Sequence, residues 1–378
     1  INPADSRKRK CNDSNADALP RLWNRKESDM KKLNVAVFFG GCSSEYSVSL
    51  SSASGVILNL DGEKYHPLMV GITQEGHWYY YTGPVDKLLN DTWHNSEDCV
   101  PAVLSPNRGE RSLLLLKAGG VERIPVDVAF PVLHGKNGED GTIQGLIELA
   151  GIPLAGCGTL ASALGMDKDR AHKLVSLAGV RVPRHLVLER DASFRDAADF
   201  DRELGYPIYV KPVKAGSSYG ITKIFKEEQL SQAIELAFRY DNQAILEENI
   251  EGFEVGCAVL GNRRLTVGEV DEIELSGDFF DFTEKYTLKT SAIHVPARID
   301  AAKAAEIKEA AKCIYTALGC SGFARVDLFL TPAGEIIFNE VNTIPGFTEH
   351  SRYPGMMKAA GYPFRQVLTE IIELALAI

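Results

Sequence analysis

Residues 322–329 (GFARVDLF) and 335–342 (EIIFNEVN), joined by a turn with proline and glycine, predict a β-hairpin. Because side chains alternate along a strand, Arg325 and Asp327 share one face of the first strand. Glu340 and Asn342 share a face of the second strand in the same way. Three oxygen ligands and one cation therefore converge, and oxygen ligands without cysteine or histidine favour Mg²⁺. The alternative, an exposed polar face, is disfavoured because the apolar neighbours make an unpaired pair of carboxylates costly.

The chain has 378 residues, of which 45% are hydrophobic and 24% charged, which is typical of a globular protein with two or three domains. The formal charge of −10 argues against a nucleic-acid binder that acts through a basic face. The seven cysteines include no C-x-x-C pair and indicate a reducing cytoplasm rather than a disulfide framework. No apolar run approaches the roughly 18 residues of a membrane span. We therefore expect a cytoplasmic protein without a nucleic-acid or membrane partner.

Residues 1–29 are expected to be a disordered or non-native leader outside the fold. They carry seven lysines or arginines and five aspartates or glutamates, without apolar periodicity or the apolar core of a signal peptide. Met30 and the strand-like run that follows it mark the expected start of the folded chain. The basic run at 7–10 leaves a nuclear signal as the alternative.

Short apolar runs alternate with helix-length amphipathic segments after Met30, which predicts an α/β fold without an internal repeat. Helices are expected at 48–60, 142–150, 167–178, 196–204, 227–240 and 301–318. Strands are expected at 34–39, 66–72, 126–133, 185–188, 207–210, 221–225, 244–247, 254–260 and 265–273. The polar loop 134–141 joins a buried strand to a helix, which is where open α/β sheets bind ligands.

Several polar segments allow two interpretations. The loop 216–220 (GSSYG) after Lys211 is either an anion-binding loop or a plain β-turn, and it lacks the P-loop pattern. Glu45 either caps a helix or binds a ligand, and His134 is either structural or a ligand contact. Glu247 and Glu254 flank a chain crossover, where isolated glutamates are usually solvated. The glycines at 40–41 fail the G-x-G-x-x-G spacing, which makes a nicotinamide dehydrogenase a weak alternative.

Seven ordered blocks between residues 30 and 378 resemble the D-alanine:D-alanine ligase family of ATP-grasp enzymes. The blocks are GGxSxExxVS at 40–49, HGxxGEDG at 134–141, MDK at 166–168, KP at 211–212 with GSSxG at 216–220, EKY at 284–286, RxD at 325–327 and NExNTxPG at 339–346. The resemblance implies a three-domain ATP-grasp ligase of the α/β (α+β) class, whose N-terminal domain contains a Rossmann-like parallel sheet. The domains would be residues 30–167, 168–249 and 250–378, with ATP between the last two.

The resemblance also implies the nucleotide and metal ligands. ATP would contact Lys168, Lys211, Ser217, Ser218, Glu247, Glu248, Ile250, Glu254, Lys285 and Asn339. Asp327, Glu340 and Asn342 would bind two Mg²⁺ ions, which Mn²⁺ can replace, and the ions would neutralise charge as the γ-phosphoryl group moves. Ser217 and Ser218 would lie on a lid whose closure excludes water.

The implied chemistry activates the carboxylate of D-alanine as an acyl phosphate, which the amine of a second D-amino acid then attacks. Glu45 would receive the ammonium group of the first substrate, in a network with Ser217 and Tyr286. Arg325 and the Gly346 backbone N–H would stabilise the oxyanion of the tetrahedral intermediate. The two substrate subsites would contain Glu45, Val48, Ser49, His134, Arg325, Gly346, Ser351 and Arg352.

The second subsite departs from the housekeeping pattern, in which an apolar residue usually follows the serine. Here Arg352 follows Ser351, and Tyr286 is kept, whereas D-lactate enzymes generally lack that tyrosine. The sequence is in this respect similar to VanG-type D-alanine:D-serine ligases of vancomycin resistance, since a guanidinium offers donors for a hydroxyl group. D-serine is therefore the expected acceptor, with D-alanine as the alternative. A non-catalytic nucleotide-binding protein is disfavoured because the metal and oxyanion residues are present, and the family implies a homodimer.

Overall fold

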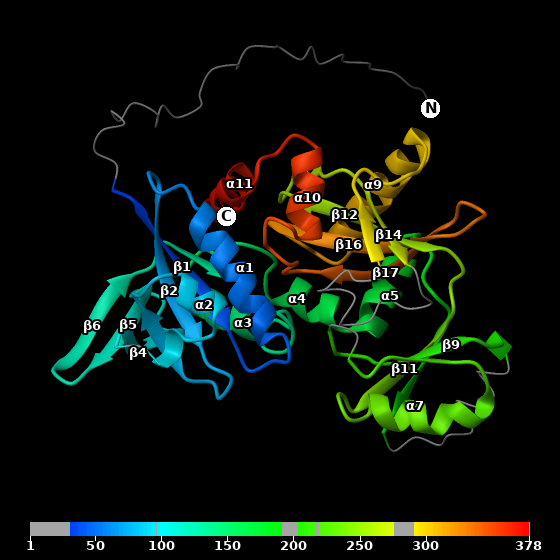
Figure 1. The fold of residues 1–378 in the computed structure, drawn as a ribbon, viewed down its shortest axis with the longest axis horizontal. Coiled ribbons are helices and arrows are strands. Elements are labelled where there is room, and N and C mark those ends of the chain that lie inside the picture. Colours follow the sequence, from blue (N-terminus) through cyan, green and yellow to red (C-terminus); the bar gives the residue numbers. More distant parts are fainter. Residues whose placement is uncertain (1–30, 96, 191–202, 217–218, 276–290, 378) are drawn as a thin grey trace, which may run out of the picture. The chain divides into compact units, whose positions relative to one another are not determined.

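The structure is a computed structural model that describes residues 31–95, 97–190, 203–216, 219–275 and 291–377. The strands in these ranges form three β-sheets, one in each range predicted as a domain (Figure 1). The mixed α/β class is confirmed, whereas the predicted leader lies outside the described residues. No helix in the described ranges is long and apolar enough to cross a bilayer.

The first sheet has the order β6-β5-β4-β3-β2-β1-β7 among the described residues. Its strands are β1 (Leu33–Gly40), β2 (Tyr65–Ile72), β3 (Trp78–Tyr81), β4 (Cys99–Leu104), β5 (Ser112–Lys117), β6 (Gly120–Pro125) and β7 (Val128–Pro131). The predicted parallel core is present, because β1 pairs in parallel with both β2 and β7. Strands β3 to β6 extend it as an antiparallel meander that we did not predict. Short connections such as the one between β5 and β6 join antiparallel strands, whereas a parallel crossover needs a dozen or more residues.

Helices cover both faces of the first sheet and bury its central strand. They are α1 (Tyr46–Asn59), α2 (Asp86–Leu89), the 3₁₀ helix η2 (Trp93–Asn95) and α3 (Thr142–Ala150). The next helix, α4 (Thr159–Met166), packs through Ala161 in a separate core. Residues Val35 to Phe39 of β1 are all 0% exposed. Val37 packs in one core with α1, and Phe38 packs in another with α3. Burial on both faces explains the continuous apolar run from which this strand was predicted.

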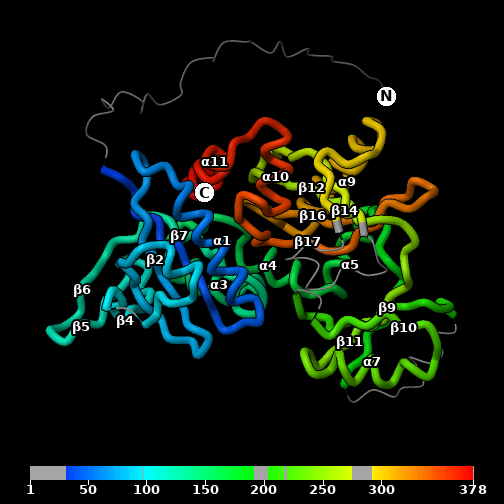
Figure 2. Tube along the Cα trace, in the orientation of Figure 1, coloured from blue at the N-terminus to red at the C-terminus, as the bar shows by residue number. Residues whose placement is uncertain are grey.

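The C-terminal helices return to the first sheet. They are α10 (Arg352–Ala359) and α11 (Phe364–Leu376). Ile371 and Ile372 of α11 are fully buried in the same core as Val37 and Leu50. Figure 2 shows the red end of the chain beside the blue helix α1. The range 250–378 therefore contributes to a core that the N-terminal sheet shares.

The second sheet is antiparallel throughout, with the order β10-β9-β11-β8. Its elements are α5 (Lys168–Leu177), β8 (His185–Glu189), β9 (Ile208–Pro212), β10 (Thr222–Ile224), the 3₁₀ helix η3 (Glu227–Gln229), α7 (Leu230–Ala237) and β11 (Gln243–Glu248). We expected the strand to end before Lys211, but β9 includes this residue, which pairs with Ile245 of β11. Lys211 is therefore a strand residue, and it is buried. Most of the helix predicted at 196–204 lies outside the described residues.

The third sheet carries the predicted hairpin. Its elements are β12 (Phe253–Leu260), β13 (Thr266–Val267), β14 (Asp271–Leu275), β15 (Ser291–His294), α9 (Ala301–Ala317), β16 (Phe323–Leu330) and β17 (Ile336–Asn342). The main order is β15-β14-β12-β16-β17, and β13 also pairs with β12. The prediction of a single strand at 265–273 is wrong, because β13 and β14 are separate strands and residues 268–270 belong to neither. There the Gly268 N–H donates to the Ala258 carbonyl at 2.9 Å, and the Glu269 N–H donates to that of Met356 in α10 at 3.0 Å.

Candidate active site

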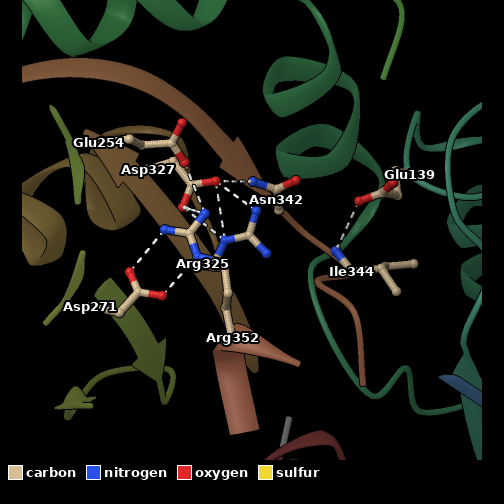
Figure 3. Close-up of polar contacts among 8 residues, drawn as sticks. All are labelled: Glu139, Glu254, Asp271, Arg325, Asp327, Asn342, Ile344 and Arg352. Atoms are coloured by element: carbon tan, nitrogen blue, oxygen red, sulfur yellow. Dashed lines mark hydrogen bonds and ion pairs between the residues drawn. The ribbon is translucent and has the colours of Figure 1, made fainter. Parts of the chain in front are cut away.

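The β16–β17 hairpin concentrates charged side chains on one face. Arg325 donates from Nε and Nη2 to the two oxygens of Asp327, at 2.8 Å and 2.6 Å. Asn342 Nδ2 donates to Asp327 Oδ2 at 2.9 Å (Figure 3). Glu340 pairs with Asp327 across the two strands, and a bulge after Asp327 separates this register from the rest of the hairpin. The convergence predicted from strand alternation is therefore confirmed.

Arg352, the first residue of α10, extends this group of side chains. Its guanidinium holds Asp271 of β14 in a bidentate pair, Nε to Oδ2 at 2.7 Å and Nη2 to Oδ1 at 2.8 Å. Its Nη1 donates to Glu254 Oε1 of β12 at 2.8 Å and lies 3.4 Å from Asp327 Oδ1. A Cβ on Gly256 would lie 2.4 Å from Arg352 Nη2. A glycine in β12 therefore makes room for the arginine, and two strands fix its position.

These residues form a buried network, which we term the hairpin cluster. It contains Glu254, Asp271, Arg325, Asp327, Glu340, Asn342 and Arg352. Asp271 is 0% and Asp327 1% exposed. Both carboxylates accept bidentate hydrogen bonds from arginine, the geometry that makes charge-assisted pairs strong. Two guanidinium groups face four carboxylates, which leaves a formal charge of −2.

The donor set of the hairpin cluster fits Mg²⁺. No group of three or more His, Cys, Asp and Glu side chains suited to a metal occurs in the part of the chain that the structure describes. Magnesium needs only one or two carboxylates when substrate phosphates and water complete its octahedron. Asp327 and Glu340 are adjacent across the strands, and Asn342 supplies an amide oxygen. The excess negative charge of the cluster matches a divalent cation.

A second group of predicted residues surrounds Glu45 at the N-terminus of α1. Glu45 is 6% exposed, and its side chain makes no capping hydrogen bond, so the capping interpretation is wrong. A Cβ on Gly135 would lie 2.9 Å, and one on Gly216 2.7 Å, from Glu45 Oε1. The loop after β7 and the loop after β9 therefore approach the same carboxylate. Burial raises the pKa of Glu139, in the same loop as Gly135, and Glu45 raises it further.

Two predicted substrate residues next to Glu45 differ in their surroundings. The hydroxyl of Ser49 is 0% exposed, accepts the Gly40 N–H at 2.8 Å and donates to the Val132 carbonyl. It therefore joins β1 to the loop after β7. Val48, one residue earlier, is partly exposed.

A third group lies between α5, β9 and β11. Lys211 forms a buried ion pair with Glu247, which is 3% exposed, so the expectation that Glu247 is solvated is wrong. Burial raises the pKa of Glu247, but the nearby charges, that of Lys211 first, and the hydrogen bond from Lys211 together lower it to about 2. His172 Nδ1 lies 3.9 Å from Glu247 Oε1, and burial lowers the pKa of His172 to about 4. Lys168 Nζ donates to the Ala215 carbonyl at 2.7 Å.

The other predicted nucleotide residues are divided among these groups. Glu248 accepts from Arg184 Nε at 3.1 Å, and Ile250 lies two residues after the end of β11. Glu254 belongs to the hairpin cluster rather than to the Lys211 group. The Asn339 carbonyl lies 3.4 Å from His172 Nε2. Ser217, Ser218, Lys285 and Tyr286 lie outside the described residues.

The loop between β17 and α10 brings Gly346 beside Ser351. A Cβ on Gly346 would lie 3.1 Å from Ser351 Oγ, and that hydroxyl accepts the Thr348 N–H at 3.0 Å. The Ile344 and Phe347 N–H groups donate to Glu139 Oε1 at 3.3 Å and to a hydroxyl of α1 at 3.2 Å. Both predicted residues, Gly346 and Ser351, therefore lie in one short loop held by the N-terminal domain.

Sequence reasoning missed Asp271 and His172 as members of these groups. Asp271 is one of three acidic residues in β14, with Glu272 and Glu274, and only the tertiary structure pairs it with Arg352 of α10. His172 lies on α5, one turn after Lys168, and tertiary packing brings it to 3.9 Å from Glu247 of β11. No local pattern in the sequence distinguishes either residue.

Three sheets, a glycine loop after β9, and a carboxylate pair on a C-terminal hairpin together define an ATP-grasp ligase. The family model described as "D-ala D-ala ligase N-terminus" matches residues 34–157, and the model "D-ala D-ala ligase C-terminus" matches residues 174–373. The chain therefore belongs to the D-alanine–D-alanine ligase family, as predicted from the seven blocks.

Similar proteins with known names include ligases and resistance proteins. The crystal structure of VanG D-Ala:D-Ser ligase from Enterococcus faecalis is 57% identical, with a TM-score of 0.84 over 91% of this chain and 100% of that one. A putative D-alanine–D-lactate ligase from Streptomyces coelicolor is 45% identical over 92% of this chain and 99% of its own. Vancomycin C-type resistance protein VanC1 from Enterococcus gallinarum is 44% identical over 92% and 98%.

Proposed function

We propose that this protein joins D-alanine to D-serine in an ATP- and Mg²⁺-dependent reaction. The observation that carries the D-serine preference is Arg352, held by Asp271 next to Ser351. Asp271 and Glu254 occupy three of the five N–H donors of the guanidinium. Among the described residues, the group thus keeps donors for a ligand oxygen. The similarity to a VanG D-Ala:D-Ser ligase supports the same acceptor.

The proposed reaction has two steps. A carboxylate oxygen of D-alanine forms a bond to the γ-phosphorus of ATP, the bond between that phosphorus and the β,γ-bridging oxygen breaks, and ADP leaves. The amine of D-serine, after losing a proton, then forms a C–N bond at the acyl carbon. The tetrahedral intermediate collapses when its C–O bond to phosphate breaks, which releases phosphate and the dipeptide. Bound Mg²⁺ would neutralise phosphate charge.

The described residues have distinct roles in this proposal. Glu45, buried between two glycine loops, receives the ammonium group of D-alanine. Arg325, oriented by Asp327, and the Gly346 N–H donate to the oxyanion. Lys168 and Lys211 bind ATP phosphates. Asp327, Glu340 and Asn342 hold the metal, and the two predicted lid serines would exclude water.

The first test measures ATP-dependent phosphate release with Mg²⁺ and D-alanine, with and without D-serine, and identifies dipeptides by mass. We expect mainly D-alanyl-D-serine at equal acceptor concentrations. D-alanyl-D-alanine alone would overturn the acceptor assignment and leave a housekeeping ligase. Absence of ATP turnover would overturn the enzymatic function.

A paired substitution tests Arg352 and removes its bidentate partner Asp271 with it, so that this carboxylate is not left buried and unpaired. The double change Arg352→Leu with Asp271→Leu replaces an ion pair by apolar side chains, which proteins tolerate better than removal of one partner. We expect the ratio of D-serine to D-alanine incorporation to fall roughly 10- to 100-fold. Pockets usually discriminate by about this factor between substrates that differ in one small group. An unchanged ratio in a folded variant would refute the role of Arg352.

The cellular role follows from the product. A peptidoglycan precursor that ends in D-serine binds glycopeptides more weakly, so we propose a function in vancomycin resistance through cell wall synthesis in the cytoplasm. VanC1 and VanG are resistance or D-Ala:D-Ser proteins by name and support this proposal. The family resemblance also underlies the proposed homodimer.

A further inference from the structure

The loop that carries Gly346 is held by side chains of another part of the chain. Glu139, in the loop after β7, accepts the Ile344 N–H at 3.3 Å. Ser52, on α1, accepts the Phe347 N–H at 3.2 Å. Gly346 lies between these two anchored positions. Figure 3 shows the contact between Glu139 and Ile344.

His134 joins the two anchors. Its Nε2 lies 3.0 Å from Ser52 Oγ, and both residues are buried. Burial lowers the pKa of His134 to about 4, and a hydrogen bond to the Ile344 backbone opposes that shift. The ring is therefore neutral at pH 7. Its Nε2 can accept a hydrogen bond from Ser52. Since Ser52 Oγ accepts from Phe347, its own hydrogen is available for His134 Nε2.

Glu139 also connects this loop to the pocket of the first substrate. Its Oε2 accepts the Gly135 N–H at 2.8 Å, while its Oε1 accepts that of Ile344. Gly135 is the residue whose Cβ would lie 2.9 Å from Glu45 Oε1. The carboxyl group of Glu139, whose pKa burial raises to about 8, thus contacts backbone on both sides of the site, with one oxygen for each side.

A glycine donor needs such external anchors. Glycine restricts its own backbone less than any other residue does. Oxyanion stabilisation, in contrast, requires a donor that is preorganised at the position of the developing charge. Anchors at Ile344 and Phe347 restrict the backbone on either side of Gly346.

We propose that Ser52, His134 and Glu139 form a clamp of positioning residues that aims the Gly346 N–H at the tetrahedral intermediate. The clamp rests on the proposed function and adds residues of the N-terminal domain to the oxyanion site. It acts on the second step, because the oxyanion forms only when the amine attacks the acyl carbon. Formation of the acyl phosphate does not need it.

Ser52→Ala tests one anchor, with Ser54→Ala as the matched control. Both serines are buried on α1, but Ser54 Oγ donates only within its helix, to the Leu50 carbonyl at 2.8 Å. We expect Ser52→Ala to lower kcat for dipeptide formation about 10-fold. Removal of a whole oxyanion donor usually costs more, about 10²–10³-fold. The KM for ATP and the melting temperature should change little, and Ser54→Ala should retain its kcat.

Glu139→Gln tests the other anchor, with Asp140→Asn as its control. A glutamine has one acceptor oxygen, so it keeps only one of the two N–H contacts. Asp140 also accepts two N–H groups, from Asn137 at 2.8 Å and Thr142 at 3.1 Å, but both lie in its own loop. We expect Glu139→Gln to slow dipeptide formation and Asp140→Asn to leave it within about twofold, since its contacts are local.

Positional isotope exchange in ATP labelled at the β,γ-bridging oxygen separates the two steps. Exchange in the presence of D-alanine reports reversible formation of the acyl phosphate. If the clamp acts on the second step, the ratio of exchange to dipeptide formation rises in Ser52→Ala and Glu139→Gln. An unchanged kcat in both folded variants, or an equal fall of exchange and ligation, would overturn the clamp. If the unmodified protein formed no dipeptide, that result would instead overturn the proposed function.

Discussion

The molecule contains two buried clusters of charge that are built differently. In the hairpin cluster, both oxygens of Asp271 and of Asp327 accept hydrogen bonds from arginine. In the Lys211 group, His172 Nδ1 and Glu247 Oε1 are buried without a hydrogen-bond partner among the described residues. The two atoms face each other at 3.9 Å. Paired hydrogen bonds from arginine fix both carboxylates of the first cluster, whereas the carboxylate of the second cluster is held by a single ion pair with Lys211.

The hairpin cluster mainly fixes the direction of its groups, whereas the Lys211 group mainly supplies charge. A network of bidentate pairs fixes the direction of each guanidinium, which suits residues that must aim donors at a reacting atom. A lone ammonium is a point charge with three rotatable donors, which suits a phosphate that can approach from several directions. We therefore expect changes in the hairpin cluster to affect turnover first, and changes in the Lys211 group to affect stability and its pH dependence.

The largest expected effect is that of Arg325→Ala on turnover. It removes a preorganised oxyanion donor and leaves Asp327, 1% exposed, without its bidentate partner. We expect kcat to fall about 10²–10³-fold, the usual loss for one such donor. Arg325→Lys keeps the charge but loses the fork, and should fall in between. Phosphate release measures both variants, and full activity of Arg325→Ala would refute the assigned role.

Lys211→Met should give the next largest effect, on stability. It leaves Glu247 buried beside His172 without its ion-pair partner. Breaking a buried ion pair by removing one partner costs about 3–5 kcal/mol. Urea denaturation measures the loss. Adding Glu247→Leu should recover most of it, since no charge is then stranded, and a double variant as unstable as the single one would contradict this account.

Sequence patterns predicted some contacts of the hairpin cluster but not others. Alternation within one strand is a local property, so the shared face of Arg325 and Asp327 followed directly from the sequence. The contact of Arg352 with Asp271 joins residues 81 positions apart and depends on how α10 packs on β12 and β14. We predicted that Arg352 offers donors to a ligand at the second subsite, and the structure shows carboxylates on three of these donors.

The seven blocks predicted the family, but the antiparallel meander β3–β6 was missed. β6 is mostly exposed and has no apolar run, and the four leucines of β5 form a run too short to show which strands it pairs with. The burial of Glu247 was missed for a related reason. A strand position between two sheets becomes buried through tertiary packing, which no local pattern records.

The acid dependence of stability should report on the Lys211 group through the pKa shifts of two of its members. The pKa of His172 is lowered from 6.5 to about 4 by burial, so the unfolded chain binds a proton first. Stability from the neutral ring is complete above pH 6.5 and is lost as the pH falls toward 4, by about 3 kcal/mol. The lowered pKa of Glu247 adds a loss from pH 4.5 down to about 2. Unfolding by urea at each pH should show both stages, and His172→Phe should flatten the upper stage alone.

Gly256→Ala probes the hairpin cluster most gently and gives the smallest expected effect. The new Cβ would lie 2.4 Å from Arg352 Nη2 and 2.5 Å from Asp271 Oδ1, so the ion pair must shift while its charges remain. Overpacking of this kind costs about 1–3 kcal/mol, part of which side-chain movement relieves. If Arg352 selects D-serine through its position, the ratio of D-serine to D-alanine incorporation falls several-fold with little loss of total ligation. Gly62→Ala, where a Cβ meets no atom within 4 Å, serves as the control. A ratio as unaffected as that of the control would show that the charge of Arg352, rather than its placement by Asp271, determines the acceptor.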